Sequence, residues 1–453
     1  MISNSAIKIY YHLPPAIRSF ALSTLGLIKN HKKYGPDYQC YLDFLLHSSH
    51  EEQKNRAEEE LQQYLRYIRS HAPYYKNMIN YSNDLEDLPL IDKKVVISNY
   101  TSFIMDSPYC TGQSSGTSGQ PIKIPYSKQA YQKEYAFWWY HRSFGNIHRG
   151  DKIATIAGHK IADVTSDKPP FWIYNMSDNQ MLFSSYHMSP KNMPHYVEEL
   201  NHFKPVFIHG YPSSISMIAS YILENSIMLD FRPRMIATSS ETLLDFQRRN
   251  IEQAFGTKVS IFYGNSEFCG NIIECPNGKL HVQPYHSYVR ILKDDGNHAQ
   301  AGEQGRIVAT NFANFSFALV NYDMRDIVQV SLDQSCTCGK GGLVLDSISG
   351  RMENYIITPE GRWVGRLDHL FKDAQYVRNA QIEQNDPSSV IIRIESEPGY
   401  SSAIEKTILE ETRIRMGRTI SVRFEYVREI EKLPNGKFPF ILQKIRRMQP
   451  GGN

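Results

Sequence analysis

The order of apolar segments from about residue 150 onward is the feature that most constrains the fold. Four short apolar runs alternate there with segments of helical length. The runs are 152–157, 205–209, 234–238 and 258–263, and helical segments lie between them at 194–203 and 243–255. Strands that alternate with helices indicate parallel pairing, because a parallel connection needs a crossover of a dozen or more residues. We therefore expect an α/β body built on a parallel sheet.

The segments on either side of this region follow other patterns. An amphipathic helix is predicted near the N-terminus by apolar residues at helical spacing, namely Leu61, Tyr64, Leu65 and Ile68. A strand is expected within 302–311. Beyond Gly350, residues 390–394 are β-rich, 404–409 are helical, and 420–426 alternate apolar with polar side chains. We expect a large N-terminal α/β domain over residues 1–349 and a smaller α+β domain over 350–453.

Charge and hydropathy exclude several classes of protein. Fifty Lys and Arg residues against 47 Asp and Glu leave a net charge of +3 in 453 residues, so binding to nucleic acid is not expected. No segment reaches the roughly 20 apolar residues of a membrane span. Residues 13–28 come nearest but contain two prolines and Arg18. We expect a cytoplasmic protein with at most a peripheral membrane contact.

Residues 111–121 form a loop rich in glycine and hydroxyl side chains, Thr-Gly-Gln-Ser-Ser-Gly-Thr-Ser-Gly-Gln-Pro. Consecutive backbone N–H groups and hydroxyls in such a loop can surround phosphate oxygens. A flexible linker is one alternative, although a proline and an expected strand at 122–125 follow at once. A hydrolase elbow with Ser114 as nucleophile is another, because 112–116 match G-x-S-x-G. No hydrophobic strand enters the turn, so we favour phosphate binding.

Four later segments carry further polar groups at turns. Residues 262–267 end an expected strand with Phe-Tyr-Gly-Asn-Ser-Glu, and Glu267 could hold Mg²⁺. In 322–327, Asp326 could accept hydrogen bonds from ribose hydroxyls. Residues 349–353, Ser-Gly-Arg-Met-Glu, lie at the expected domain boundary, and 433–438 place Lys437 in a turn. The alternatives are a surface ion pair of Asp326 with Arg351 and a solvated lysine at 437.

In this order the five segments resemble those of the adenylate-forming (ANL) ligases. The resemblance is nearest to the phenylacetate–CoA ligase-like branch that includes the CapK-like proteins of capsular polysaccharide biosynthesis. It implies a large N-terminal domain and a mobile C-terminal lid. It also implies an ATP-dependent, AMP-forming ligase, in which a carboxylate attacks the α-phosphate of ATP to form an acyl-adenylate. A thiol or amine then displaces AMP, and no protein nucleophile is required.

The resemblance also implies a role for each matched residue. The β- and γ-phosphates would be held by Ser114, Ser115, Gly116, Thr117, Ser118 and Gly119. The adenine would be flanked by Ser239, Ser240, Glu241, Tyr263 and Gly264. Ser266 would contact the α-phosphate and Glu267 the Mg²⁺ ion, while Asp326 and Arg351 would bind the ribose. Glu353 matches the hinge position, and Lys437 would stabilise the transition state of adenylation.

Two departures from the family pattern are visible. The lysine that many members carry just after Gly-x-Pro is displaced by one position, to Lys123. The Thr-Gly that usually precedes the ribose-binding aspartate is replaced by Met324-Arg325.

Four residues that can bind zinc lie in two short segments of the sequence. Cys275 and His281 lie in one segment, and Cys336 and Cys338 lie in the other. Three thiolates and an imidazole would fill a tetrahedral zinc site and leave no open position, so the metal would be structural. The alternatives are free thiols beside a surface histidine, or Cys269 as one of the ligands. Six cysteines in this length do not form a disulfide scaffold.

The residues of the expected pocket indicate the kind of carboxylic acid that serves as substrate. Candidate pocket segments are 135–141, 158–160, 184–187 and 209–213. They contain His141, His159, Lys160, His187 and His209, which favours a polar, anionic or sugar-linked acid. The resemblance narrowly favours an amine acceptor in surface polysaccharide (capsule or lipopolysaccharide) assembly. The alternatives are a CoA thioester product and a binding protein that keeps the fold without catalysis.

Overall fold

The structure is a computed structural model of the chain. It describes residues 10, 13–76, 85–114, 122–159, 161–162, 168–189, 191–351, 356–359, 363–364, 367–371, 374, 376–417, 419–431 and 439–445.

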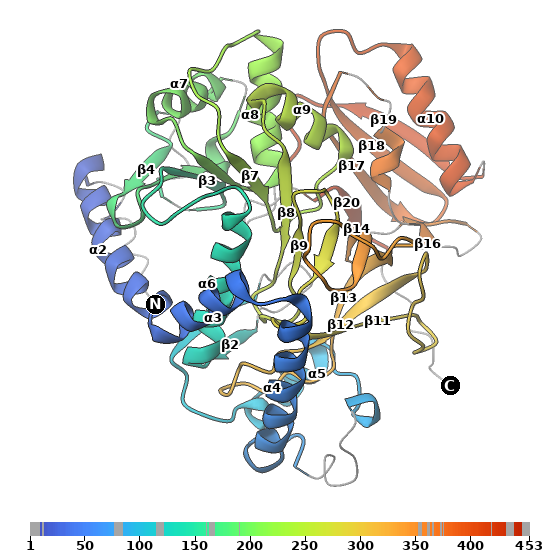
Figure 1. The fold of residues 1–453 in the computed structure, drawn as a ribbon. Helices are drawn as coiled ribbons and strands as arrows, with labels where there is room; N and C mark the ends of the chain where they lie inside the picture. Colours follow the sequence, from blue (N-terminus) through green and yellow to red (C-terminus); the bar gives the residue numbers. More distant parts are fainter. Residues whose placement is uncertain are drawn as a thin grey trace.

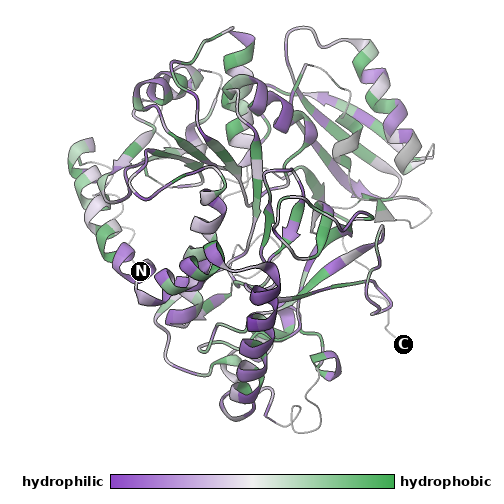
Figure 2. Cartoon of the chain, viewed as in Figure 1, coloured by the Kyte–Doolittle hydropathy of each residue, from purple (hydrophilic) through white to green (hydrophobic). Residues whose placement is uncertain are grey.

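The N-terminal third is helical, as expected (Figure 1). The helices of the chain are α2 (Pro15–Lys33), α3 (Pro36–His47), α4 (His50–His71), α5 (Lys93–Ser98), α6 (Lys128–Ser143), α7 (Met193–Phe203), α8 (Pro212–Glu224), α9 (Asp245–Phe255) and α10 (Ser402–Met416). Helix α4 begins with a capping box between Ser49 and Glu52. Its predicted apolar face is buried, and its other faces make the helix mainly purple in Figure 2.

Twelve strands form one large sheet in the order β11-β12-β13-β14-β10-β9-β8-β7-β6-β3-β5-β4. Their bounds are β3 (Ile153–Ala157), β4 (Trp172–Asn175), β5 (Gln180–Ser184), β6 (Phe207–Gly210), β7 (Met235–Thr238), β8 (Val259–Tyr263), β9 (Ile272–Glu274), β10 (Leu280–Val282), β11 (Tyr288–Leu292), β12 (Gln304–Thr310), β13 (Tyr322–Val330) and β14 (Val344–Arg351).

The parallel half of this sheet confirms the four strands predicted from the apolar runs. Strands β5, β3, β6, β7 and β8 pair in parallel, and their side chains pack against α7, α8 and α9. Ile156, Ile208 and Ile236 lie in that core with Leu200 and Ile251. Figure 2 shows these central strands mainly in green. The helical crossovers cover the sheet, so its strands are apolar on both faces.

The other half of the sheet is antiparallel, which the apolar runs did not predict. Strands β9 to β14 pair antiparallel with one another, and β9 also pairs antiparallel with β8, because their connections are too short to hold a crossover helix. Residues 275–279, for example, join β9 directly to β10. The apolar runs predicted the strands β8 and β12 here but carried no information on their direction.

The C-terminal region forms a separate four-stranded sheet in the order β19-β18-β17-β20. Its strands are β17 (Val377–Asp386), β18 (Ser389–Ser396), β19 (Ser421–Tyr426) and β20 (Ile441–Gln443), and β15 (Ile356–Ile357) pairs with β16 (Trp363–Val364) nearby. The predicted strands at 390–394 and 420–426 and the helix at 404–409 are confirmed. The predicted boundary at 349/350 falls inside β14 and stays a prediction.

Helix α2 exposes apolar side chains and buries polar ones. Phe20 is 65% exposed, and Leu27 and Ile28 are also exposed, whereas Ser23 and Asn30 are buried against the segment that follows β4. Within the described parts of the chain, no helix combines the length and hydropathy that a membrane span requires. The predicted peripheral membrane contact stays a prediction.

Candidate active site

A cavity of about 1800 Å³ lies at the carboxyl ends of the parallel strands. Strands β6, β7 and β8 all end at this edge, which is where open α/β sheets bind ligands. The cavity is lined by nine of the residues that the sequence assigned to the nucleotide, namely Ser114, Ser239, Ser240, Glu241, Tyr263, Gly264, Ser266, Glu267 and Asp326. Residues up to 212 positions apart in the sequence therefore share one site, although their individual roles stay predictions.

The end of β6 makes a close contact with β3 that requires a glycine. Gly210 pairs with Ile156 of β3, and a Cβ at Gly210 would lie 2.0 Å from the Ile156 carbonyl oxygen. Only glycine allows this close approach of the two strands. The next residues leave the sheet and line the cavity.

Asp326 is oriented by a tyrosine. The Tyr263 hydroxyl at the end of β8 donates to Asp326 Oδ2 at 2.5 Å, and the aspartate is 9% exposed. Asp326 is also the direct antiparallel partner of Arg351 across β13 and β14, so the two predicted ribose residues are neighbours in register. A carboxylate held at a cavity wall does not fit the alternative of a surface ion pair for Asp326.

The turn after β8 holds Ser266 and Glu267 at the cavity wall. The Asn271 side chain donates to the Tyr263 carbonyl at 3.1 Å, and the Tyr126 hydroxyl donates to the Ser266 carbonyl at 2.5 Å. Glu267 is only 8% exposed. Burial, together with the charge of Glu267, raises the pKa of Tyr126. An anionic oxygen ligand at the wall of a cavity fits a Mg²⁺ ion.

The segment after β7 is anchored from two sides. His209 Nε2 lies 3.1 Å from Ser239 Oγ, and the backbone N–H of Ser213 donates to Glu241 Oε2 at 3.2 Å. Burial, followed by the charge of Arg142, lowers the pKa of His209 to about 3. His209 is therefore neutral at physiological pH and contributes a polar but uncharged wall.

The glycine-rich loop connects two antiparallel strands, β1 (Cys110–Gln113) and β2 (Lys123–Tyr126). The Ser114 N–H donates to the Ile122 carbonyl, and the Ile122 N–H donates to Ser114 Oγ, both at 2.9 Å. A nucleophile elbow leads from a strand into a helix, whereas this loop leads into a second strand. The alternative of Ser114 as a hydrolase nucleophile is therefore not supported.

Several predicted site residues lie outside the described residues. They are Ser115, Gly116, Thr117, Ser118, Gly119, Glu353 and Lys437. The segment that follows Lys437 is described, and residues 439–443 line the cavity. The described part of the C-terminal sheet therefore reaches the same site.

The assignment of two histidines to the substrate pocket was wrong. His141 lies 2.7 Å from Ser260 Oγ, and His187 lies 2.8 Å from Ser184 Oγ and stacks on Phe171. Both are buried and neither lines the cavity. His159 and His209 do line it, and Lys160 lies outside the described residues.

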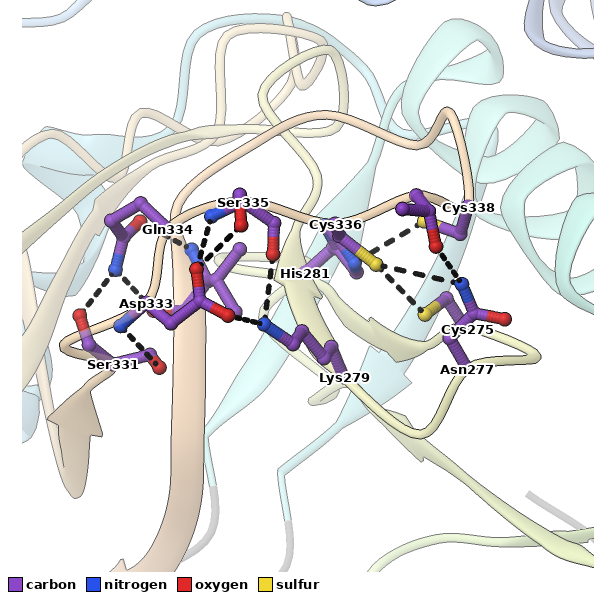
Figure 3. A network of polar contacts seen from close by, with 12 residues as sticks. Cys275, Asn277, Lys279, His281, Ser331, Asp333, Gln334, Ser335, Cys336 and Cys338 are labelled. Carbon is purple, nitrogen blue, oxygen red and sulfur yellow. Dashed lines mark hydrogen bonds and ion pairs between the residues drawn. The ribbon is translucent and has the colours of Figure 1, made fainter.

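The predicted zinc ligands come together at one point (Figure 3). The ligand atoms of Cys275, His281, Cys336 and Cys338 all lie within 4.8 Å of one another. Cys275 Sγ is 3.8 Å from Cys336 Sγ, and Cys338 Sγ is 3.5 Å from His281 Nε2. Tetrahedral zinc with ordinary bond lengths sets about 3.8 Å between sulfurs and about 3.6 Å between sulfur and nitrogen. The four side chains therefore fit zinc.

Groups around the cluster hold its ligands in place. His281 Nδ1 lies 3.2 Å from the Gly341 carbonyl, which favours the tautomer that leaves Nε2 free to bind a metal. Lys279 pairs with Asp333 and donates to the Ser335 carbonyl at 2.8 Å, so the two cysteine segments are tied together (Figure 3). Cys269 is not part of the cluster, because it is buried in the core.

The sequence-based prediction missed five cations that line the cavity, namely Lys29, Lys33, Arg142, Arg149 and Arg248. The spacing of Tyr135, Trp138, Trp139 and Arg142 is that of one helix face, and this signal could have identified Arg142. Lys29 and Lys33 on α2 are likewise spaced as on one helix face, whereas Arg149, beyond the end of α6, carried no such signal.

Comparisons with known proteins agree with this arrangement. The family model of the CapK C-terminal domain matches residues 356–444. The chain is 26% identical to Protein CapK of Staphylococcus aureus, over 97% of this chain and 99% of that protein. It is 25% identical to the indoleacetate–lysine synthetase of Pseudomonas savastanoi, over 49% of this chain and 53% of that protein.

A solved structure has the same fold. The 2-hydroxyisobutyryl-CoA ligase in its postadenylation state superimposes with a TM-score of 0.67 at 14% identity, covering 86% of this chain and 89% of that one. The chain therefore has the fold of this ligase, and its residues 356–444 match the family of the CapK C-terminal domain.

Proposed function

We propose that this protein is an ATP-dependent, AMP-forming carboxylate ligase that transfers an activated acyl group to an amine. The observation that carries the proposal is that nine of the predicted nucleotide residues line one cavity.

The chain's residues then divide the work of adenylation. Asp326, oriented by Tyr263, accepts ribose hydroxyls, while Ser266 and the loop that begins at Ser114 donate to phosphate oxygens. A carboxylate oxygen of the substrate attacks the α-phosphorus, and the bond from that phosphorus to pyrophosphate breaks. Mg²⁺ held by Glu267 would neutralise charge on the phosphate oxygens. The acceptor then attacks the acyl carbon, and AMP leaves with the electron pair of the broken bond.

The acceptor of the acyl group is proposed from the similarity to known proteins. An amine is favoured by the similarity to a synthetase that is named for lysine as its second substrate. A CoA thioester is the second candidate, because the structural neighbour is named as a CoA ligase. A role in surface polysaccharide assembly rests on the similarity to Protein CapK.

A pyrophosphate-release screen tests the proposal. Purified protein is incubated with ATP, Mg²⁺ and a panel of carboxylic acids, each with CoA, with amines or with neither acceptor. We expect release of pyrophosphate and AMP with a subset of acids, and hydroxylamine should trap the activated acyl group. Absence of turnover with every acid would favour a binding protein. Labelling of Ser114 by a fluorophosphonate would favour a hydrolase.

We also propose that Cys275, His281, Cys336 and Cys338 bind a structural zinc ion, and this proposal yields a stability prediction. Purified protein should contain about one zinc ion per chain by metal analysis. Cys338→Ala should release the metal and lower the thermal unfolding midpoint by several degrees, because metal binding contributes to folding. Activity per folded molecule should change little.

A matched control for this prediction is available. Cys40 is exposed on α3, and Cys40→Ala removes a thiol without touching the cluster. Its metal content and unfolding midpoint should equal those of the unchanged protein. Active, folded protein that contains no zinc would contradict the zinc proposal.

A further inference from the structure

Part of the cavity lining, which we call the second chamber, comes from other elements than those that carry Glu267 and Asp326. It consists of described lining residues of α2, of the C-terminal half of α6, of β3, β4 and β5, and of the segments next to them. In Figure 1, α2 lies on the opposite side of α6 from β13 and β14. The charged side chains that line this chamber are Lys29, Lys33, Arg142, Arg149 and Asp178.

The cations reach the chamber because two helices turn one face toward it. On α6, Trp138, Trp139 and Arg142 recur at helical spacing, and on α2, Lys29 and Lys33 do the same. The two helices contact each other, so their cations share one space. Burial lowers the pKa of Lys33, the charge of Asp178 raises it, and the charges of Lys29, Arg142 and Arg149 lower it further, so all five groups lie close together.

Arg142 is the cation that most needs a partner. Its guanidinium lies over Trp139 at 4.7 Å and over Phe207 at 5.1 Å, and its Nε is buried without a hydrogen bond. Among the residues that the structure describes, none forms an ion pair with it. The same helix buries Lys133, and that ammonium has Glu60 Oε2 at 3.0 Å. Buried charges are normally paired in this way.

Asp178 is the one carboxylate among the described residues of this chamber, and its charge acts on both Lys33 and Arg142. Asp178 Oδ1 accepts from Asn30 at 2.7 Å, and Oδ2 accepts from Asn175 at 2.9 Å. These amides are neutral and fix the carboxylate against α2. Burial and then the charge of Lys29 lower the pKa of His159, so this histidine adds no charge near neutral pH. Among the described residues of the chamber, four cations against one anion leave an excess of positive charge.

We propose that the second chamber binds an anionic group of the acid substrate, remote from the carboxylate that reacts. The substrate class is therefore a carboxylic acid with a second anionic group, bound by Arg142 together with Lys33. The planar guanidinium, which lies over the Trp139 ring, can donate two parallel hydrogen bonds to a carboxylate or a phosphate. This inference rests on the proposed ligase function and specifies its substrate.

The experiment compares matched acids in the pyrophosphate assay. Succinate, glutarate and adipate are paired with butyrate, valerate and hexanoate, and O-phosphoserine tests whether the second anion is a phosphate. We expect higher kcat/KM for the doubly anionic acids. Arg142→Met keeps the packing on Trp139 but removes the charge, and it should lower the ratio of dianionic to monoanionic kcat/KM about 10- to 100-fold.

Arg66→Met is the matched control, because Arg66 is exposed on α4 and outside the cavity. It should leave the ratio unchanged. An equal ratio in Arg142→Met and in the unchanged protein would overturn the inference while the ligase function stood. A preference of the unchanged protein for monocarboxylates would do the same.

Calorimetric titration separates this inference from the ligase proposal. If no acid supports pyrophosphate release, the same dianionic acids are titrated into the full chain without ATP. Binding that is lost in Arg142→Met but kept in Arg66→Met would support the anion site even though the proposed function had failed. Binding that is absent, or equal in both variants, would overturn the anion site.

Discussion

Glu267→Gln is expected to lower the rate of pyrophosphate release about 1000-fold or more. The substitution keeps the shape of the side chain but removes the anionic oxygen that would bind Mg²⁺ at the cavity wall. A loss of this size equals about 4 kcal/mol of transition-state stabilisation. The rate is measured in single-turnover experiments with saturating ATP and the best acid of the screen.

The fold should survive this change. Tyr126, Asn271 and the backbone hold the turn independently of the Glu267 carboxylate, so the unfolding midpoint and zinc content should stay close to those of the unchanged protein. Glu59→Gln, on the exposed face of α4, is a control for loss of one negative charge. Undiminished release in folded Glu267→Gln would reduce Glu267 to a structural residue of the turn.

The sequence could place the residues proposed to bind the nucleotide because they lie in short motifs of contiguous residues. Tyr263, Gly264, Ser266 and Glu267 follow one strand directly, and the ends of parallel strands meet at one edge of a sheet. Short motifs at strand ends therefore carry enough information to place residues that are far apart in the sequence.

The second chamber could not be predicted in the same way. Lys33 and Arg142 lie more than 100 positions apart, on helices whose mutual packing the sequence does not specify. Arg142 also lies in the last turn of its helix, where a positive charge is favourable because of the helix dipole, so its position alone does not indicate a binding site. The direction of β9 to β14 was missed for a related reason, since apolar runs mark strands without showing how they pair.

The histidines show where residue type misleads. His141 and His187 lie in segments that were expected to form the pocket, yet serine hydroxyls satisfy both of them in the core. The cations of the chamber indicate a polar or anionic acid more directly than these histidines did.

Lys437→Ala tests the proposed lid movement, because the two half-reactions should respond differently. Lys437 lies outside the described residues, but Pro439, two positions later, lines the cavity. An ammonium beside the α-phosphate in a poorly hydrated site contributes about 3–4 kcal/mol, on the order of 100- to 1000-fold in rate. Lys437→Ala should therefore slow acyl-adenylate formation by that factor. Lys406→Ala, on the exposed face of α10, is the matched control.

Transfer from preformed acyl-adenylate to the acceptor should be nearly unchanged in Lys437→Ala, because the lid is proposed to have moved by then. That movement would break the bidentate ion pair in which Arg378 of β17 donates to both carboxylate oxygens of Glu224 on α8, at 2.5 and 2.7 Å. A proline at the hinge, Glu353→Pro, should show the reverse pattern and slow transfer more than adenylation. Equal loss of both half-reactions in folded Lys437→Ala would instead make the lysine a general binding residue.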